Sequence, residues 1–175
     1  MRIGTLLPTL GLALVSATAS AQDVTYDYDK TTDFSKIKTY AWIPGTNLRD
    51  ELNHKRIVTA IDAQLTAKGL TQAAAGAPPD VLVAYHAAFD KDLQINASSF
   101  DSGPWRYGGN RSGSARVEEV VNGTLVVDLV DAKTETLIWR GIAKKDIDTN
   151  AKPEKRDKNM NKAAEKLFKN YPPAK

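Results

Sequence analysis

Residues 118–143 read EEVVNGTLVVDLVDAKTETLIWRGIA and decide the fold class. The run at 124–130 is rich in branched side chains that favour strands, and residues 135–143 resume the same character. Between them, residues 131–134 (DAKT) supply turn chemistry, because an Asp side chain can accept a hydrogen bond from the backbone two residues further on. The stretch predicts a hairpin of two antiparallel strands at 118–130 and 135–143.

The segment before this hairpin predicts further strands. Residues 81–89 are apolar on both faces except for His86, which is typical of a central strand covered on both sides. Leu93 and Ile95 suggest a partner strand close by. Residues 98–115 are rich in Gly and Ser and follow neither strand nor helix periodicity, so they predict a surface loop.

Two more strands and a helix are expected nearer the N-terminus. Residues 24–29 and 36–43 alternate between apolar and polar side chains, and we expect these two strands to pair with each other. Residues 49–68 predict a helix that ends at Gly69, a residue common after a helix C-terminus. The apolar stripe of this helix comprises Leu52, Ile57, Val58, Ile61 and Leu65.

The C-terminal segment has the most regular pattern in the chain. Its apolar residues recur at the three-to-four spacing of one helix face. Pro153 suits the first turn of this helix, and Pro172-Pro173 should end it. The residues of the stripe are Met160, Ala163, Ala164, Leu167, Phe168 and Tyr171.

This order of elements predicts an α+β fold. Strands that follow one another in hairpins, with one helix between them and one after them, favour a single antiparallel or mixed sheet of about five to six strands with two helices packed on one face. No internal repeat or second domain is apparent, so residues 22–175 are interpreted as one domain.

Residues 1–21 have the order of a secretory signal peptide. A positive Met1-Arg2 start precedes an uncharged, largely apolar run at 3–15, then small residues that end in Ala19-Ser20-Ala21. We expect cleavage after Ala21 and a periplasmic location. A buried N-terminal helix is the alternative, but the polar strand pattern from Gln22 onward disfavours it. No second apolar run is comparable in length, so no transmembrane segment is expected in the mature chain.

The composition excludes several classes of site. The chain contains no cysteine, which rules out disulfides, thiolate metal sites, thiol nucleophiles and a lipid anchor on an N-terminal cysteine. Basic and acidic residues nearly balance, 24 against 21, so the charge gives no argument for nucleic-acid binding. We therefore expect no nucleic-acid partner.

Several stretches resemble the bacterial domain-of-unknown-function family 4136, many of whose members are envelope lipoproteins. The resemblance covers nearly all of the chain after Ala21 and implies a shared fold and an envelope location, but no reaction. Unlike many relatives, this chain lacks the lipoprotein cysteine, which favours a soluble periplasmic protein. The matching stretches are residues 26–29, 33–35, 38–42, 61–63, 68–69, 79–86, 123–125, 128–133, 139–141, 167–168 and 171–173.

The sequence shows no catalytic, cofactor-binding or metal-binding pattern. The spacing of Asp27, Asp29 and Asp33 does not match a calcium loop, and the two histidines, His54 and His86, are far apart in the sequence. His86 is expected to be a hydrogen-bonded core residue of its strand. The alternative is a hydrolase acting on an envelope polymer, with His86 and Asp128 or a neighbouring carboxylate as its acid–base pair.

Two segments are candidates for binding. Trp105, Arg106 and Tyr107 combine two aromatic rings with a guanidinium, a composition enriched in interfaces, and they would either contact a glycan or protein partner or fold back over the sheet. The C-terminal helix has a strongly basic face. We expect its apolar stripe to pack on the sheet, and peripheral membrane contact is the alternative. The resulting functional hypothesis is a non-catalytic binding or assembly module of the envelope.

Overall fold

The computed structural model describes residues 23–45, 50–98 and 114–173. Its elements form one six-stranded sheet and two long helices. In chain order they are β1 (Asp23–Tyr28), the 3-10 helix η1 (Phe34–Lys36), β2 (Thr39–Trp42), α1 (Glu51–Ala67), β3 (Thr71–Gln72), β4 (Val81–Ser98), β5 (Ser114–Asp131), β6 (Leu137–Ile147) and α2 (Pro153–Leu167).

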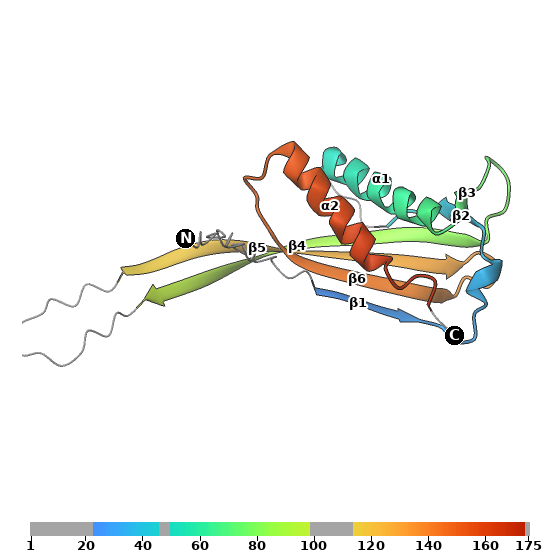
Figure 1. Ribbon diagram of the computed structural model, residues 1–175, viewed down its shortest axis with the longest axis horizontal. Coiled ribbons are helices and arrows are strands. Elements are labelled where there is room, and N and C mark those ends of the chain that lie inside the picture. The colour runs from blue at the N-terminus through green and yellow to red at the C-terminus, as the bar shows by residue number, and fades with distance from the viewer. Residues whose placement is uncertain (1–22, 46–49, 99–113, 174–175) are drawn as a thin grey trace, which may run out of the picture.

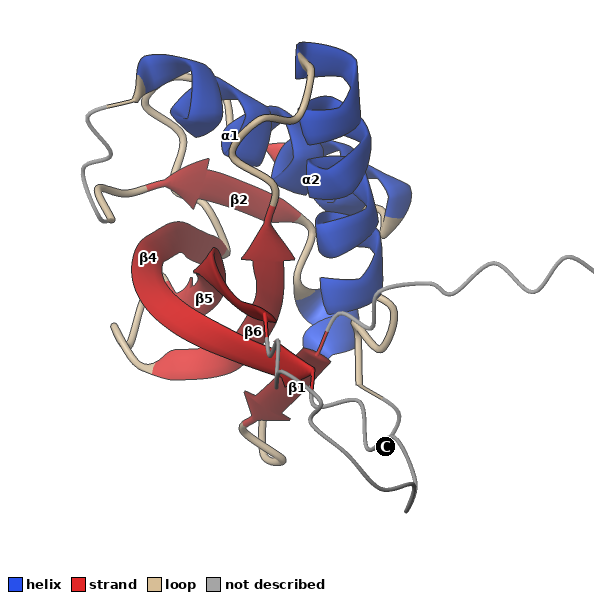
Figure 2. Ribbon diagram, turned by 90° about the vertical axis from the view of Figure 1, so that its left-hand side faces the viewer, coloured by secondary structure: helices blue, strands red, loops and turns tan. Residues whose placement is uncertain are grey.

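The sheet is mixed. Its strand order is β1-β6-β5-β4-β2-β3, in which β1, β6, β5 and β4 are antiparallel neighbours and β2 runs parallel to both β4 and β3. Both helices lie on the same side of the sheet (Figures 1 and 2). The paired strands β4 and β5 extend far beyond them (Figure 1). The predicted α+β class, with one sheet and two helices on one face, is confirmed.

The central hairpin forms as its sequence predicts. Asp131 Oδ1 accepts hydrogen bonds from the backbone N–H of Lys133 at 2.9 Å and of Thr134 at 2.8 Å. The bond from Thr134 is the largest of several contacts that hold the pKa of the Asp131 carboxyl below its ordinary value. The side chain thus organises the turn that joins β5 to β6.

The predicted pairing of the first two strands is wrong. β1 pairs with β6, with Tyr28 opposite Trp139. β2 lies toward the opposite edge of the sheet, beside β4. Pairing between distant strands overrides sequence proximity here. η1 interrupts the chain between β1 and β2, and its buried Phe34 packs edge-on against Tyr28 and Tyr171.

The predicted break after Phe89 is also wrong. Leu93 and Ile95 belong to β4 itself, which continues to Ser98, and β5 begins at Ser114 in register with it. The two ends of the predicted loop at 98–115 therefore belong to β4 and β5. Residues 99–113 lie outside the described residues. Backbone pairing with β5 carries β4 past the polar residues that interrupt its apolar pattern.

α1 packs on the sheet through Ile57, Ile61 and Leu65. Asp62 of this helix accepts hydrogen bonds from the Tyr40 hydroxyl at 2.8 Å and from Trp42 Nε1 at 2.9 Å, which ties α1 to β2. Gly69 follows the helix with φ of +86°, as predicted for a C-terminal glycine.

Leu52, which was assigned to the same apolar stripe, is 67% exposed. It precedes Ile57 by five residues, and a rotation of about 100° per residue moves it away from the buried face.

α2 packs on β6 through an aromatic cluster. The ring of Phe168 stacks on Trp139 with centroids 5.1 Å apart, and Tyr171 meets both rings edge-on. Burial raises the pKa of Tyr171 to about 12. A Cβ on Gly141 would lie 2.5 Å from the Trp139 ring and 2.9 Å from Leu167, so only glycine allows this close approach.

The predicted stripe of α2 is confirmed. All of its members are buried except Met160, which is partly buried, while the basic face is exposed. Pro153 occupies the first turn, as predicted, but the helix ends at Leu167 with Phe168 as its C-cap, before the two prolines.

Truncating Phe168 should destabilise the protein strongly. Phe168 is fully buried, so Phe168→Ala is expected to lower the free energy of unfolding by about 3–5 kcal/mol. Lys158→Glu and Lys166→Glu, on the exposed face, should change it by less than about 0.5 kcal/mol. Denaturant melts of the three variants measure these differences. A parent-like melt for Phe168→Ala would contradict the packing of α2.

Asp80 should make stability depend on pH. Its Oδ2 accepts bonds from the backbone N–H of Lys38 and of Thr39, both at 2.9 Å, and these bonds hold the pKa of its carboxyl below the ordinary 3.8. Because the folded pKa is the lower one, this contribution is present above pH 3.8 and is lost as the pH falls through the folded pKa.

Asp80→Asn keeps an acceptor but removes the charge, so we expect a loss of about 1 kcal/mol at pH 7. Thermal melts between pH 7 and pH 2 should show the gap between the two proteins closing below about pH 4. A gap that stays constant down to pH 2 would show that the charge of Asp80 does not matter.

Candidate functional site

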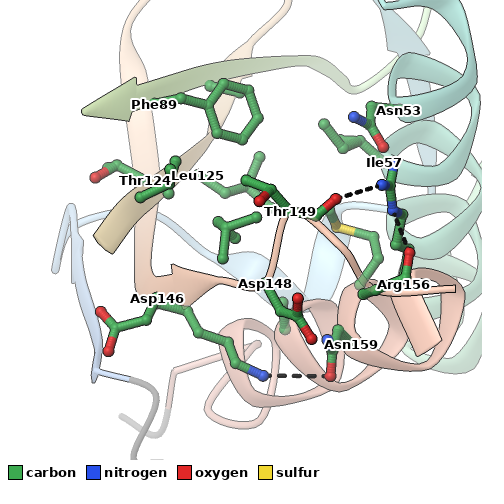
Figure 3. A pocket seen from close by; sticks show the side chains of 18 of the residues that line it. Asn53, Ile57, Phe89, Thr124, Leu125, Asp146, Asp148, Thr149, Arg156 and Asn159 are labelled. Carbon is green, nitrogen blue, oxygen red and sulfur yellow. Dashed lines mark hydrogen bonds between the residues drawn. The ribbon is translucent and has the colours of Figure 1, made fainter. Parts of the chain in front are cut away.

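An apolar cleft lies between the helices and the sheet, at the end of the domain from which the β4–β5 hairpin extends. Its volume is about 470 Å³. Figure 3 shows Phe89 and Leu125 on the strand side of the cleft, and Ile57 and Asn159 on the helix side. The connection between β6 and α2, which includes Asp148 and Thr149, also lines it.

The floor of the cleft comes from strand residues that face the helices. The register places Phe89 opposite Gly123, and Gly123 opposite Lys145. A Cβ on Gly123 would lie 2.7 Å from Cγ1 of Ile147, so the Ile147 side chain lies over this glycine. Apolar floor residues are Ala87 and Phe89 on β4, Val121, Gly123 and Leu125 on β5, and Ala143 and Ile147 on β6.

The inner part of the cleft is apolar. Ile57 of α1 and Ala163 of α2 are buried there, as are Leu125 and Ala143 of the sheet. Toward the outside, Phe89 is 50% exposed and Ile147 is 38% exposed. Exposing large apolar side chains costs free energy, and beside an apolar cleft such side chains are typical of a binding surface.

The polar groups of the lining come from both helices, from the connection that precedes α2 and from the strands. Arg56 Nε donates to Asp157 at 2.6 Å. Arg156 donates to the backbone carbonyls of Ala151 at 2.9 Å and Thr149 at 2.8 Å, which closes one side of the cleft (Figure 3). Lys145 Nζ donates to Asn159 Oδ1 at 3.3 Å and bridges β6 to α2.

The charges around the cleft nearly balance. Its lining has four basic residues, Arg56, Lys91, Lys145 and Arg156, and three acidic ones, Asp50, Asp146 and Asp148. Asp50 caps α1 by accepting from the backbone N–H of Asn53. Asp148 pairs with Lys155 at 2.8 Å, which is the main cause of its lowered pKa. The arrangement thus combines an apolar interior with polar groups that already bond to the protein.

His86 and Asp128 lie on the opposite, helix-free face of the sheet. The prediction that His86 is a core residue is wrong, because its side chain is 48% exposed: β4 is covered on one face only. Asp128 is buried, and both of its oxygens accept hydrogen bonds from Arg140 at 2.6 Å. His86 Nε2 lies 3.9 Å from Asp128 Oδ2, beyond hydrogen-bond distance. This geometry favours a structural Asp–Arg pair over an acid–base pair.

The other candidates fall in different places. Trp105, Arg106 and Tyr107 lie outside the described residues. His54, on α1, hydrogen-bonds through Nδ1 to the hydroxyl of Tyr85 beneath the helix. Within the described chain, no group of three potential His, Cys, Asp or Glu metal ligands occurs, and no helix is long and apolar enough to cross a membrane.

Reasoning from the sequence did not find the cleft. Gly123 and Ile147 are separated by the whole β5–β6 hairpin, and only the strand register brings them together. The sequence pattern predicts that Phe89 ends a strand covered on both faces, which would leave no exposed ring beside a cleft. The one usable signal was a glycine inside a strand-forming run at 118–130, since an interior glycine often marks a close approach of another group.

The solved structures that resemble this chain show its fold. A PDZ-domain protein from Parabacteroides distasonis superimposes with a TM-score of 0.56 at 17% identity, over 88% of this chain but only 37% of the other. This chain thus spans about a third of that protein's length. A DUF4136 family protein from Bacteroides thetaiotaomicron gives a TM-score of 0.52 at 16% identity, over 86% of this chain and 96% of the other.

No curated protein matches the sequence. The family model described as "Domain of unknown function (DUF4136)" matches residues 24–173, which include every described helix and strand except the first residue of β1. The resemblance noted in the sequence is thereby confirmed, and the chain belongs to the DUF4136 family.

Proposed function

We propose that this protein is a non-catalytic binding module of the bacterial envelope and that the cleft between its helices and its sheet is the binding site. The observation that carries the proposal is the apolar interior of about 470 Å³, which lies within the size range of pockets that enclose one small molecule. Polar side chains at its margin are bonded to the protein itself, so they shape the cleft without forming a reacting set.

The location follows from the signal-peptide pattern at residues 1–21 and from the family resemblance. A periplasmic binding module could contact an envelope protein or glycan through Trp105, Arg106 and Tyr107, which the sequence places between β4 and β5. The exposed lysines of α2 could add peripheral contact with an anionic membrane surface.

The cleft can be tested with two neighbouring alanines of β4. Ala87 faces the cleft, and Ala88 is exposed on the other face of the same strand. Nile red, a neutral apolar dye, should bind the purified protein saturably at one site. Ala87→Phe should weaken that binding at least tenfold by filling the cleft, whereas Ala88→Phe should leave it unchanged. Thermal melts check that both variants fold. Equal dye binding by the two folded variants would contradict the assignment.

Export predicts a specific mature mass. Protein recovered from a periplasmic fraction should begin at Gln22, because cleavage is expected after Ala21. Intact-mass spectrometry of that protein measures the N-terminus. Recovery with Met1 and Arg2 still attached, or only from detergent-extracted membranes, would contradict the periplasmic assignment.

A further inference from the structure

We infer that the cleft binds a single unbranched acyl chain, with the head group of the ligand held outside. This inference rests on the proposed function and specifies its ligand class. It starts from how polar and apolar groups are distributed around the cleft. Ile57, Leu125, Ala143 and Ala163 are buried and apolar, whereas every polar side chain that lines the cleft is half-buried or exposed.

A ligand that enters this interior meets few groups able to hydrogen-bond to it. Burying a polar group without a partner costs free energy, so the inserted part of the ligand should lack donors and acceptors. The polar residues at the margin can contact only a group that stays near the entrance. Such a ligand is amphiphilic, with its polar group at one end.

A peptide fits these conditions less well. Along the floor, Val121, Gly123 and Leu125 of β5 are in register with β4 on one side and β6 on the other, so this strand offers no open edge for a peptide strand. A helix 10–12 Å in diameter would fill about 470 Å³ with only about one turn. A hydrocarbon chain has no backbone donors or acceptors to satisfy.

The entrance is suited to a flexible chain. Phe89 lies opposite Gly123 in the register of β4 and β5, and the Ile147 side chain lies over this glycine, so both apolar side chains line the outer part of the cleft. Both side chains are partly exposed and can rotate around an inserted chain. Met160 of α2, partly buried, adds an unbranched and adaptable side chain to the helix side.

The margin does not select strongly for the charge of the head group. Arg56 uses two of its five N–H donors on Asp157 and Asn53, and Arg156 uses two on backbone carbonyls, so both retain donors for a carboxylate or phosphate. Acidic residues nevertheless lie beside them. The acyl chain of the ligand should therefore determine the affinity, and the head group should modify it.

Displacement of Nile red from the purified protein tests the inference. Octanoate, decanoate and dodecanoate, kept below their micelle-forming concentrations, should displace the dye with a Kd that tightens about fourfold for each added CH₂. Ala87→Phe shortens the space available, so it should weaken dodecanoate more than octanoate. Ala88→Phe, the matched control, should reproduce the parent series.

A second displacement experiment distinguishes a free fatty acid from a membrane lipid as the source of the acyl chain. Dodecanoate and a lysophosphatidylethanolamine carrying the same acyl chain differ only in the head group. Tighter binding of dodecanoate supports the inference with a free fatty acid as ligand, and tighter binding of the lysolipid supports it with a membrane lipid as ligand.

The inference is overturned if Kd does not depend on chain length, or if an apolar hexapeptide or a rigid sterol displaces the dye more effectively than dodecanoate. If the dye still binds in a manner sensitive to Ala87→Phe in either case, the cleft remains a binding site and only the ligand class is wrong. If the dye itself does not bind, the proposed function fails as well.

Discussion

The strands of this protein are longer than its helices can cover, and the cleft follows from that mismatch. β4 and β5 each have 18 residues, which at about 3.3 Å per residue reach roughly 60 Å. α1 has 17 residues and α2 has 15, so at 1.5 Å per residue they extend for only about 25 Å and 22 Å. Past the first turns of both helices, the strands continue without a helical layer above them (Figure 1).

The two ends of the helical layer therefore have different packing. At one end, Phe168 stacks on Trp139 and the bare backbone of Gly141 lets Leu167 approach the sheet closely. Toward the N-terminal ends of the helices, the residues that line the cleft enclose about 470 Å³ that no side chain fills. Protein interiors are normally close-packed, and an unfilled apolar volume costs stability. A module that binds an apolar ligand has a physical reason to retain such a space.

Features controlled by local residues could be predicted from the sequence. The turn at Asp131 forms because its own carboxylate accepts the nearby backbone N–H groups, and the α2 stripe is buried because its spacing defines one face. The pairing of β1 with β6 was missed because that contact joins distant parts of the chain. The exposure of His86 could not be predicted, because the apolar pattern of β4 suggests cover on both faces and the helices cover only one.

The cleft was beyond prediction for a related reason. Three strands and two helices contribute to it, and none of its residues has unusual chemistry by itself. Its existence depends on strand register and on helix length. Trp105, Arg106 and Tyr107 illustrate the opposite case: their composition is conspicuous in the sequence, and their role in binding stays a prediction.

Methyl NMR spectra recorded during titration with dodecanoate test the central claim most directly. Methyl groups of Ile57, Leu125 and Met160 line the cleft, whereas those of Leu82 and Val130 belong to the opposite face of the sheet. The account predicts saturable chemical-shift changes in the first group and none in the second. Changes confined to Leu82 and Val130, or no changes in the cleft at saturating dodecanoate, would contradict it.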